Sequence, residues 1–204
     1  MHWIWSVVAG LTAQQVRIKQ AGSPKALYLT FDDGPHPINT PRLLDELAAC
    51  QAKASFFLLG DNARAHPELV RRIVAEGHVI ANHSMSHPNF RELGSLAQLA
   101  QIDQADSVLA PFDGQRRHAF RPPRGNATVT TIAASVWRRQ PLVLWTFDSF
   151  DFKLPEPELL ARLSSYTPAS GDILLFHDDM GPTWATLKQM MPIWQAAGFE
   201  LRAL

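Results

Sequence analysis

Two short motifs in the first half of the chain combine carboxylates with histidines. Asp32 and Asp33 stand side by side in the run TFDDGP at 30–35, which could form a simple tight turn because Asp-Gly and Gly-Pro both favour turns. Adjacent carboxylates repel each other unless a cation or a shared proton relieves them, so a metal site is the alternative. His83 and His87 are spaced to reach one ion, although paired histidines are also common in cores and on surfaces. Two histidines and one carboxylate would leave a position open for water, as catalytic zinc requires.

Three motifs in the second half add cations, further carboxylates and another histidine. Arg121 opens the run RPPRG, which is either a rigid loop with solvated arginines or a loop that pairs Arg121 with a carboxylate and aims a backbone N–H at an oxyanion. Asp148 and Asp151 lie in an aromatic stretch that could be plain strand and turn, or could supply that carboxylate. His177 ends an apolar run, where it is either a core histidine or a general acid, because histidine titrates near neutrality.

The elements that must position these residues are strands and helices in alternation. The predicted strands are 27–31, 55–59, 78–81, 118–120, 141–146, 172–176 and 199–201. The predicted helices are 41–49, 68–76, 96–109, 129–139, 158–165 and 184–197. Thr40, before Pro41, is the expected N-cap of the first helix. This alternation predicts a parallel sheet and an α/β fold, but it does not separate an open sheet from a closed barrel.

The candidate residues all fall where predicted strands end. In chain order they are Asp32 and Asp33, His83 and His87, Arg121, Asp148 and Asp151, and His177. The carboxyl ends of parallel strands face one rim of the fold, and sites are built on that rim. We therefore expect these groups to form a single active site.

The composition narrows the possible functions. The 204 residues include 19 Lys+Arg and 19 Asp+Glu, and 46% are hydrophobic, which predicts one folded domain rather than a disordered chain. Zero net charge argues against a nucleic-acid binder that works by neutralising phosphates. A single cysteine excludes an internal disulfide and a cysteine-based zinc site. No heptad seam or other signal indicates a partner subunit, so the oligomeric state stays open.

Residues 1–24 are interpreted as a lead-in and residues 25–204 as the domain. Residues 1–13 are apolar without Lys or Arg, so they lack the basic region of a signal peptide and are too short to span a bilayer. They could be a trimmed or vestigial export or anchor segment, or a helix or strand packed on the domain. Membrane contact is expected only through this segment or through a lipid-linked substrate.

Taken in order, the motifs resemble those of the polysaccharide deacetylases, the NodB homology domain of carbohydrate esterase family four. They read TFDDGP at 30–35, HSMSHP at 83–88, RPPRG at 121–125, DSFDF at 148–152 and LLFH at 174–177. The resemblance implies a distorted (β/α) barrel, often with seven parallel strands, and a divalent metal, usually zinc, with cobalt, nickel or manganese as alternatives. The implied reaction removes N-acetyl groups from the amino sugars of a glycan such as chitin, peptidoglycan or poly-N-acetylglucosamine.

The resemblance also implies a role for each motif residue. The implied catalytic residues are Asp32 as the base, His177 as the general acid, and Arg121 held by Asp151. The implied metal ligands are Asp33, His83 and His87. The implied substrate and oxyanion residues are Arg124, Pro123, Leu175 and Phe152. Among these, the backbone N–H of Arg124 would face the oxyanion, and Leu175 would line the pocket for the acetyl methyl group.

Two positions depart from the pattern usual in this family. Arg124 stands where tyrosine is frequent, and Phe152 where tryptophan is frequent. Arg124 exchanges a sugar-stacking ring for a cation, which would favour an anionic neighbour such as a phosphate or uronate. Phe152 keeps an apolar wall but makes it smaller and removes an N–H donor. The identity of the glycan therefore stays open.

Three other functions share this sequence pattern. They are a deformylase or deacetylase of a lipid-linked sugar, an O-acetyl xylan esterase, and a catalytically silent carbohydrate-binding module. All five motifs keep their chemical residues, which argues against the silent module. The expected partner is an acetylated glycan and not a nucleic acid. The resemblance to this family implies a location in the bacterial cell envelope or periplasm, or outside the cell, with the cytoplasm as the alternative.

Overall fold

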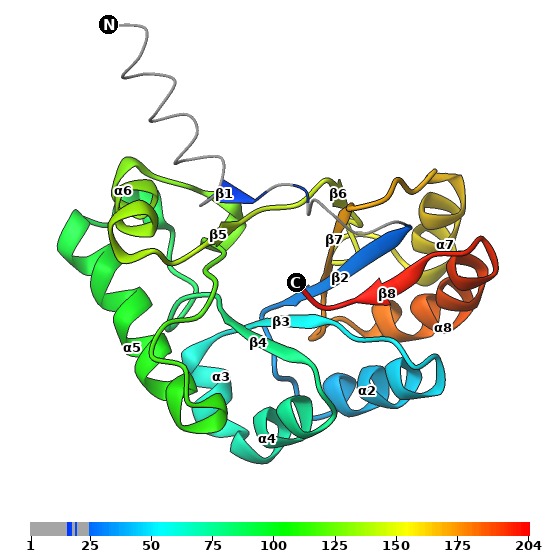
Figure 1. The fold of residues 1–204 in the computed structure, drawn as a ribbon, viewed down its shortest axis with the longest axis horizontal. Coiled ribbons are helices and arrows are strands. Elements are labelled where there is room, and N and C mark those ends of the chain that lie inside the picture. The colour runs from blue at the N-terminus through cyan, green and yellow to red at the C-terminus, as the bar shows by residue number, and fades with distance from the viewer. Residues whose placement is uncertain (1–15, 18, 20–24) are drawn as a thin grey trace, which may run out of the picture.

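The chain folds into strands that curve around a common centre, with helices outside them (Figure 1). The computed structural model describes residues 16, 17, 19 and 25–204. The strands are β1 (Val16–Arg17), β2 (Ala26–Asp32), β3 (Ser55–Leu58), β4 (Val79–Asn82), β5 (Leu142–Val143), β6 (Phe147–Asp148), β7 (Ile173–His177) and β8 (Glu200–Arg202). The α-helices are α2 (Asn39–Ala49), α3 (Gly60–Ala65), α4 (Pro67–Ala75), α5 (Ser95–Asp113), α6 (Val129–Arg138), α7 (Glu156–Ser165) and α8 (Gly181–Ala196). Two 3-10 turns are η1 (Phe90–Glu92) and η2 (Pro123–Gly125).

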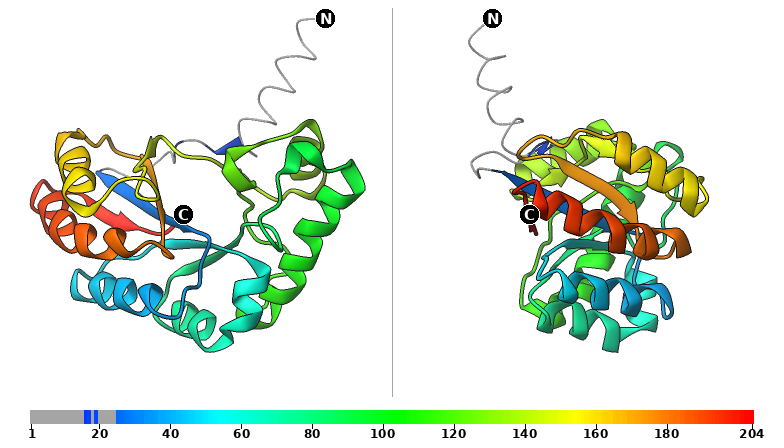
Figure 2. Two further views of the ribbon diagram at one scale, coloured as in Figure 1. Left: turned by 180° about the vertical axis from the view of Figure 1, so that it is seen from behind. Right: turned by 90° about the vertical axis from the view of Figure 1, so that its right-hand side faces the viewer.

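Parallel pairing holds the strands together. One sheet has the order β4-β3-β2-β7-β6, β8 also pairs with β2, and β1 pairs with β5 in a second ladder. Phe120 joins the two parts, because it bridges to Asn82 at the end of β4 and to Leu142 at the start of β5. All of these pairings are parallel. Both views in Figure 2 show the helices on the outer side of the curved strands, so the predicted α/β class is confirmed.

The central strand β2 separates the main core from the interior of the barrel. All seven of its residues are buried, and alternate side chains of a strand point to opposite faces. Leu27, Leu29 and Phe31 belong to the large hydrophobic core, together with residues of the surrounding helices. Thr30 and Asp32 lie on the other face, where both accept hydrogen bonds from Arg121. The strand therefore carries core residues on one face and site residues on the other.

The elements that the sequence did not predict are short. The described residues hold eight strands, compared with the seven expected. The additional strands β1 and β6 have two residues each, and α3 has six, which is too few to establish a period. The strand predicted at 118–120 is reduced to the single bridge at Phe120.

Thr40 is not the N-cap of α2, and that prediction is wrong. The helix begins at Asn39, and the cap position is occupied by Ile38 without a side-chain cap bond. The Thr40 hydroxyl instead accepts a hydrogen bond from the His36 N–H at 2.7 Å and donates one to Asp178 Oδ2 at 2.6 Å. A buried carboxylate has no water to bond, so it takes the hydroxyl that would otherwise cap the helix.

The lead-in predicted at residues 1–24 falls mostly outside the described residues. Within the part that is described, no helix combines the length and apolar character needed to cross a bilayer.

Candidate active site

Three candidate metal ligands converge at the carboxyl ends of β2 and β4. Oδ1 of Asp33 lies 3.5 Å from Nε2 of His83 and 3.5 Å from Nε2 of His87. One ligand atom from each of the three residues lies within 4.8 Å of the others. Oδ1 of Asp33 is also buried without a hydrogen-bond partner. A buried carboxylate oxygen between two imidazole nitrogens fits a divalent cation, which would relieve the cost of leaving it unpaired.

The backbone conformation of Asp33 explains how two adjacent carboxylates reach one cavity. Neighbouring side chains in a regular strand point to opposite faces. Asp33 has a φ of 73°, in the left-handed region, which breaks this alternation directly after β2. Aspartate tolerates the left-handed region better than most residues. Asp32 and Asp33 consequently both line the same cavity.

His83 is a neutral imidazole with one nitrogen held and the other directed at the cluster. Its Nδ1 lies 2.8 Å from the carbonyl oxygen of Arg121, which can only accept, so Nδ1 carries the proton. Burial lowers the pKa of His83 to about 3, because the cationic form would lose its hydration. Nε2 therefore keeps a free lone pair, as a metal ligand requires.

Asn82, the last residue of β4, makes hydrogen bonds that hold the loop carrying His83 and His87. Its Oδ1 accepts a hydrogen bond from the Ser84 N–H at 2.8 Å, and the Ser84 hydroxyl accepts one from the His87 N–H at 3.1 Å. Its Nδ2 donates to Oδ1 of Asp106 on α5 at 2.8 Å. The loop that carries both histidines is thus anchored to a helix on the outside of the barrel.

Asp106 accepts hydrogen bonds from several residues of a buried polar network. Nδ1 of His118 lies 3.0 Å from its Oδ1, and Nε2 of Gln140 donates to its Oδ2 at 2.9 Å. Nε2 of Gln140 also donates to the carbonyl of His118 at 2.8 Å. Sequence reasoning missed Asn82 and Asp106, because neither belongs to a motif with chemical spacing.

Arg121 pairs with Asp32 in the interior of the barrel. Its Nη1 donates to Oδ1 of Asp32 at 2.7 Å and to the hydroxyl of Thr30 at 2.9 Å. The guanidinium is fully buried and lies 4.1 Å from the centre of the Phe57 ring. Burial raises the pKa of Asp32, and the charge and hydrogen bond of Arg121 lower it by a smaller amount, so the pKa remains raised. Asp32 is therefore a stronger base than an exposed aspartate, while Arg121 fixes one of its oxygens.

The expectation that Asp151 holds Arg121 is wrong. Among the described carboxylates, only Asp32 lies within ion-pair distance of Arg121. Asp151 instead accepts from Nδ1 of His177 at 2.7 Å, from the His177 N–H at 2.7 Å and from the Thr183 hydroxyl at 2.6 Å. Asp151 follows β6 and lies beside the end of β7, whereas Arg121 faces β2.

Asp151 determines the protonation of His177. Burial alone lowers the pKa of His177, but the hydrogen bond and charge of Asp151, with the charge of Asp32, outweigh it and raise the pKa to about 9. The histidine is therefore protonated at neutral pH. Because Nδ1 bonds to Asp151, the Nε2 N–H is left to donate a proton.

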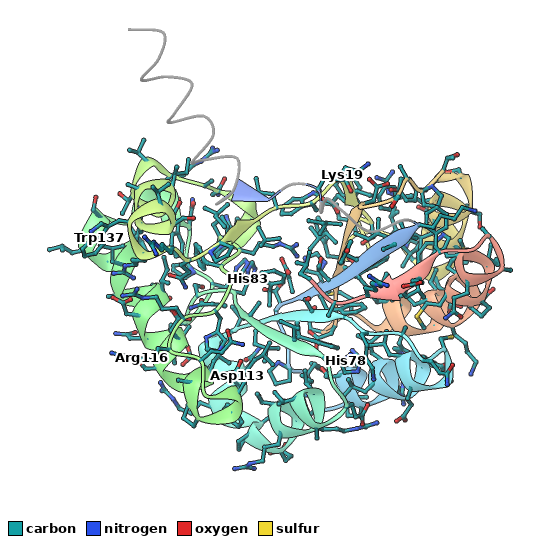
Figure 3. All side chains as sticks on the ribbon, in the orientation of Figure 1. Lys19, His78, His83, Asp113, Arg116 and Trp137 are labelled. Atoms are coloured by element: carbon teal, nitrogen blue, oxygen red, sulfur yellow. The ribbon has the colours of Figure 1, made fainter. Side chains whose placement is uncertain are left out.

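A cavity of about 420 Å³ unites the site. The predicted site residues that line it are Asp32, Asp33, His83, His87, Arg124, Leu175, Phe152 and His177. Three others do not line it and are buried, namely Arg121, Asp151 and Pro123. Figure 3 shows His83 near the centre of the ring of strands. A larger cavity of about 790 Å³ between α5 and α6 contains none of the predicted residues, so volume alone does not locate the chemistry.

Trp145, Gly125 and Asp148 complete the lining of the 420 Å³ cavity. Gly125 ends the RPPRG motif and Trp145 lies in the predicted strand 141–146, but neither residue has a predicted role. Gly125 has a φ of 65°, and a Cβ atom built there would lie 2.6 Å from the Trp145 ring. Glycine leaves room for the tryptophan ring and adopts the positive φ, so the ring packs directly on the end of the RPPRG motif.

A parallel α/β barrel with a His₂Asp cluster, a buried base and a protonated histidine at its strand ends belongs to the class of metal-dependent hydrolases. Residues 19–137 match the family model described as polysaccharide deacetylase. The chain belongs to this family.

Similar proteins are found among curated sequences and solved structures. The chitooligosaccharide deacetylase of Rhizobium leguminosarum bv. trifolii is 33% identical over 207 residues, which cover 93% of this chain and 95% of that protein. The solved structure of the Bc1960 peptidoglycan N-acetylglucosamine deacetylase matches with a TM-score of 0.85 and 30% identity. The match covers 96% of this chain and 92% of that one. The structure of a CE4 family pseudoenzyme from Bacillus anthracis also matches with a TM-score of 0.85, at 25% identity. This match covers 94% of this chain and 68% of that one. Because a pseudoenzyme shares the fold, catalysis must be argued from the residues of the site.

Proposed function

We propose that this protein is a zinc-dependent deacetylase that hydrolyses the N-acetyl groups of amino sugars in a glycan. One observation carries the proposal. The unpartnered Oδ1 of Asp33 lies 3.5 Å from each of two imidazole nitrogens, in a cavity that also holds a candidate base and a candidate acid. The named relatives that act on chitooligosaccharide and peptidoglycan support a glycan as the substrate.

The donor set fits zinc. Two neutral imidazoles and one carboxylate are ligands that zinc accepts in catalytic sites, and the buried Asp33 oxygen has no other partner in the described part of the chain. Asp33, His83 and His87 would hold the ion. A zinc ion held there would polarise the acetyl carbonyl and lower the pKa of a water molecule.

The residues of the chain supply the proton transfers. Asp32, steadied by Arg121, takes a proton from the attacking water. Arg124 lines the cavity, and its backbone N–H would donate a hydrogen bond to the carbonyl oxygen as negative charge develops on it. His177 then gives its Nε2 proton to the leaving nitrogen, because an amine is too basic to leave as an anion. Leu175 provides an apolar wall for the acetyl methyl group. The products are acetate and a free amino sugar.

The test is acetate and formate release by metal-stripped protein, with and without added zinc, from a panel of glycans. We expect acetate from N-acetylglucosamine oligomers only when zinc is present. Parallel samples with cobalt, nickel and manganese identify the metal that supports the highest rate. Formate from a lipid-linked sugar alone would replace the proposal with a deformylase, and acetate from acetylated xylan alone would replace it with an O-acetyl esterase. Glycan binding with bound zinc but no turnover would indicate a silent binding module.

A further inference from the structure

The side chain of Arg124 starts from a firmly held loop. Arg124 has a φ of 57°, in the left-handed region, and lies in the 3-10 turn η2. The Gly125 N–H donates to the carbonyl of Pro122 at 2.9 Å, and the Asn126 N–H donates to that of Pro123 at 3.1 Å. Together with the packing of Trp145 on Gly125, these bonds fix the point from which the arginine extends.

The guanidinium of Arg124 has no partner of its own. Arg124 is exposed and lines the cavity, and its side chain makes no hydrogen bond or ion pair with any described residue. The carboxylates that share the cavity are engaged elsewhere. Asp32 pairs with Arg121, Asp33 faces the two imidazoles, and Oδ1 of Asp148 accepts from the Phe150 N–H at 2.9 Å. An unpaired guanidinium at a substrate cavity is available to bind a ligand.

Another part of the cavity wall is an aromatic ring, and a second cation lies beside that ring. Phe152 is 41% exposed, and its ring centre lies 5.1 Å from that of His177. Nζ of Lys153 lies 5.0 Å from the centre of the Phe152 ring. Lys153 is exposed and forms no ion pair with the described residues. An apolar ring suits the face of a sugar, and the guanidinium of Arg124 suits a negative charge that the sugar carries.

We propose that Arg124 selects amino sugars that carry an anionic group, a carboxylate or a phosphate, close to the N-acetyl group that is hydrolysed. This inference rests on the proposed deacetylase function. A guanidinium binds either anion through two parallel N–H donors, which gives both attraction and a defined orientation. Arg124 is thus a specificity-determining residue through its side chain, in addition to the role of its backbone N–H.

The experiment compares kcat/KM for acetate release from three oligosaccharides by the zinc-loaded protein. The neutral substrate is an N-acetylglucosamine oligomer, the second contains N-acetylmuramic acid and so carries carboxylates, and the third is an N-acetylglucosamine oligomer bearing phosphate. We expect at least one anionic substrate to be preferred over the neutral one by about tenfold, which is the scale of one charge-assisted contact. The two anionic arms distinguish a carboxylate from a phosphate. The preference should shrink at high salt, because the cations are exposed.

Variants of Arg124 isolate its side chain from the rest of the site. R124A should bring the ratio of anionic to neutral kcat/KM close to one, and R124K should retain part of it, because lysine keeps the charge but not the paired donors. The matched control is R116A, which removes the same charge from an exposed residue that lies well apart from His83 in Figure 3. R116A should leave the ratio at its wild-type value.

The outcomes separate this inference from the proposed function. Efficient deacetylation of the neutral oligomer without any anionic preference would overturn the inference and leave the deacetylase function standing. The inference would also be overturned if R124A slowed all three substrates equally, because Arg124 would then act on the site as a whole. If wild-type protein with bound zinc released no acetate from any of the three, the deacetylase function would be lost, and this inference with it.

Discussion

Asp32 is the residue on which the proposed chemistry depends most directly. Its Oδ1 is bound by Arg121, while its Oδ2 lies 3.6 Å from Nε2 of His83, next to the metal cluster. One oxygen is therefore fixed and the other is directed at the place where water would be activated. The arrangement gives Asp32 a role distinct from that of its neighbour Asp33, although the two residues are adjacent in sequence.

The D32N variant should keep its metal and lose its rate. Asparagine retains an oxygen that can accept from Arg121, but it cannot take a proton, so we expect kcat to fall about 10²–10⁴-fold. Zinc content per chain, measured by atomic absorption, should match that of wild type. The buried Arg121 loses its counter-charge, so urea unfolding should also show a loss of stability of up to about 3–5 kcal/mol. A fully active D32N protein would refute the assignment of Asp32 as the base.

The pairing of Asp151 with His177 leads to a prediction about pH. The general acid must be protonated, so with a pKa of about 9 for His177 we expect kcat/KM to fall above about pH 9. Asp151 is the main cause of the raised pKa, so D151N should lower it and shift the alkaline limb of the profile to lower pH. The measurement is the pH dependence of kcat/KM for acetate release by the zinc-loaded protein. An alkaline limb at the same pH in D151N would mean that another group is titrating.

At the scale of elements, helix α5 supports the metal site from outside the barrel. The contact runs from Asp106 through Asn82 to Ser84 and His87. Each of these hydrogen bonds constrains the loop that carries the histidine ligands. Polar groups behind metal ligands usually affect both the orientation of the ligand and the affinity for the metal.

The D106N variant should weaken zinc binding. The new amide places an N–H₂ group toward either Asn82 or Gln140, both of which donate to Asp106 in the native network, so one hydrogen bond must break. We expect the zinc Kd, measured by competition with a chromophoric chelator, to rise about tenfold, with kcat at saturating zinc little changed. The control is D103N on the same helix, which alters only the surface pair with Arg138. Equal zinc affinities in the two variants would contradict a positioning role for Asp106.

The sequence predicts the elements that repeat a clear period and the residues that stand at strand ends. The six predicted helices and the strands β2, β3, β4, β7 and β8 agree with the structure, because the helices repeat an apolar period and the strands are short apolar runs between them. The positions of the Asp pair and the histidine pair after predicted strands indicate a metal site, and the family resemblance assigns Asp33, His83 and His87 as its ligands. Eight of the eleven residues to which the resemblance assigns a role line the cavity, and so does the further candidate Asp148.

The partner of Arg121 could not be predicted, because local spacing does not tell which strands face each other across the barrel. Arg121 and Asp32 are 89 positions apart, and they meet only after β2 and the segment at Phe120 curve around the same centre. The same is true of Asp106 and Asn82, which are 24 positions apart. Thr40 illustrates the converse, because a strong local cap signal is overridden by a carboxylate 138 positions away.

At the scale of the whole molecule, the candidate metal ligands lie on loops that follow two different strands, so a bound ion should stabilise the fold. Asp33 follows β2, and the histidines follow β4, while β3 lies between those strands. A ligand that binds only the folded state stabilises it, by about 2.7 kcal/mol at 100 times its Kd. For a chain of this size we expect the melting temperature to rise by about 5–10 °C when zinc is added to stripped protein.

Removal of one ligand provides the control for this stabilisation. His83→Ala should lose zinc binding, and added zinc should leave its melting temperature unchanged. Wild-type protein stripped again with a chelator should return to the lower melting temperature. An equal rise in His83→Ala would show that zinc stabilises the protein at some other place.

The left-handed backbone at Asp33 has an evolutionary consequence. Asparagine accepts this conformation as readily as aspartate does and has almost the same size. A single nucleotide change in the codon therefore converts the one anionic ligand of the cluster into a neutral amide, with little expected cost to folding. The fold can thus be retained when the catalytic activity is lost. On the proposed function, a single mutational step at Asp33 would therefore remove the metal and the reaction while the fold is kept.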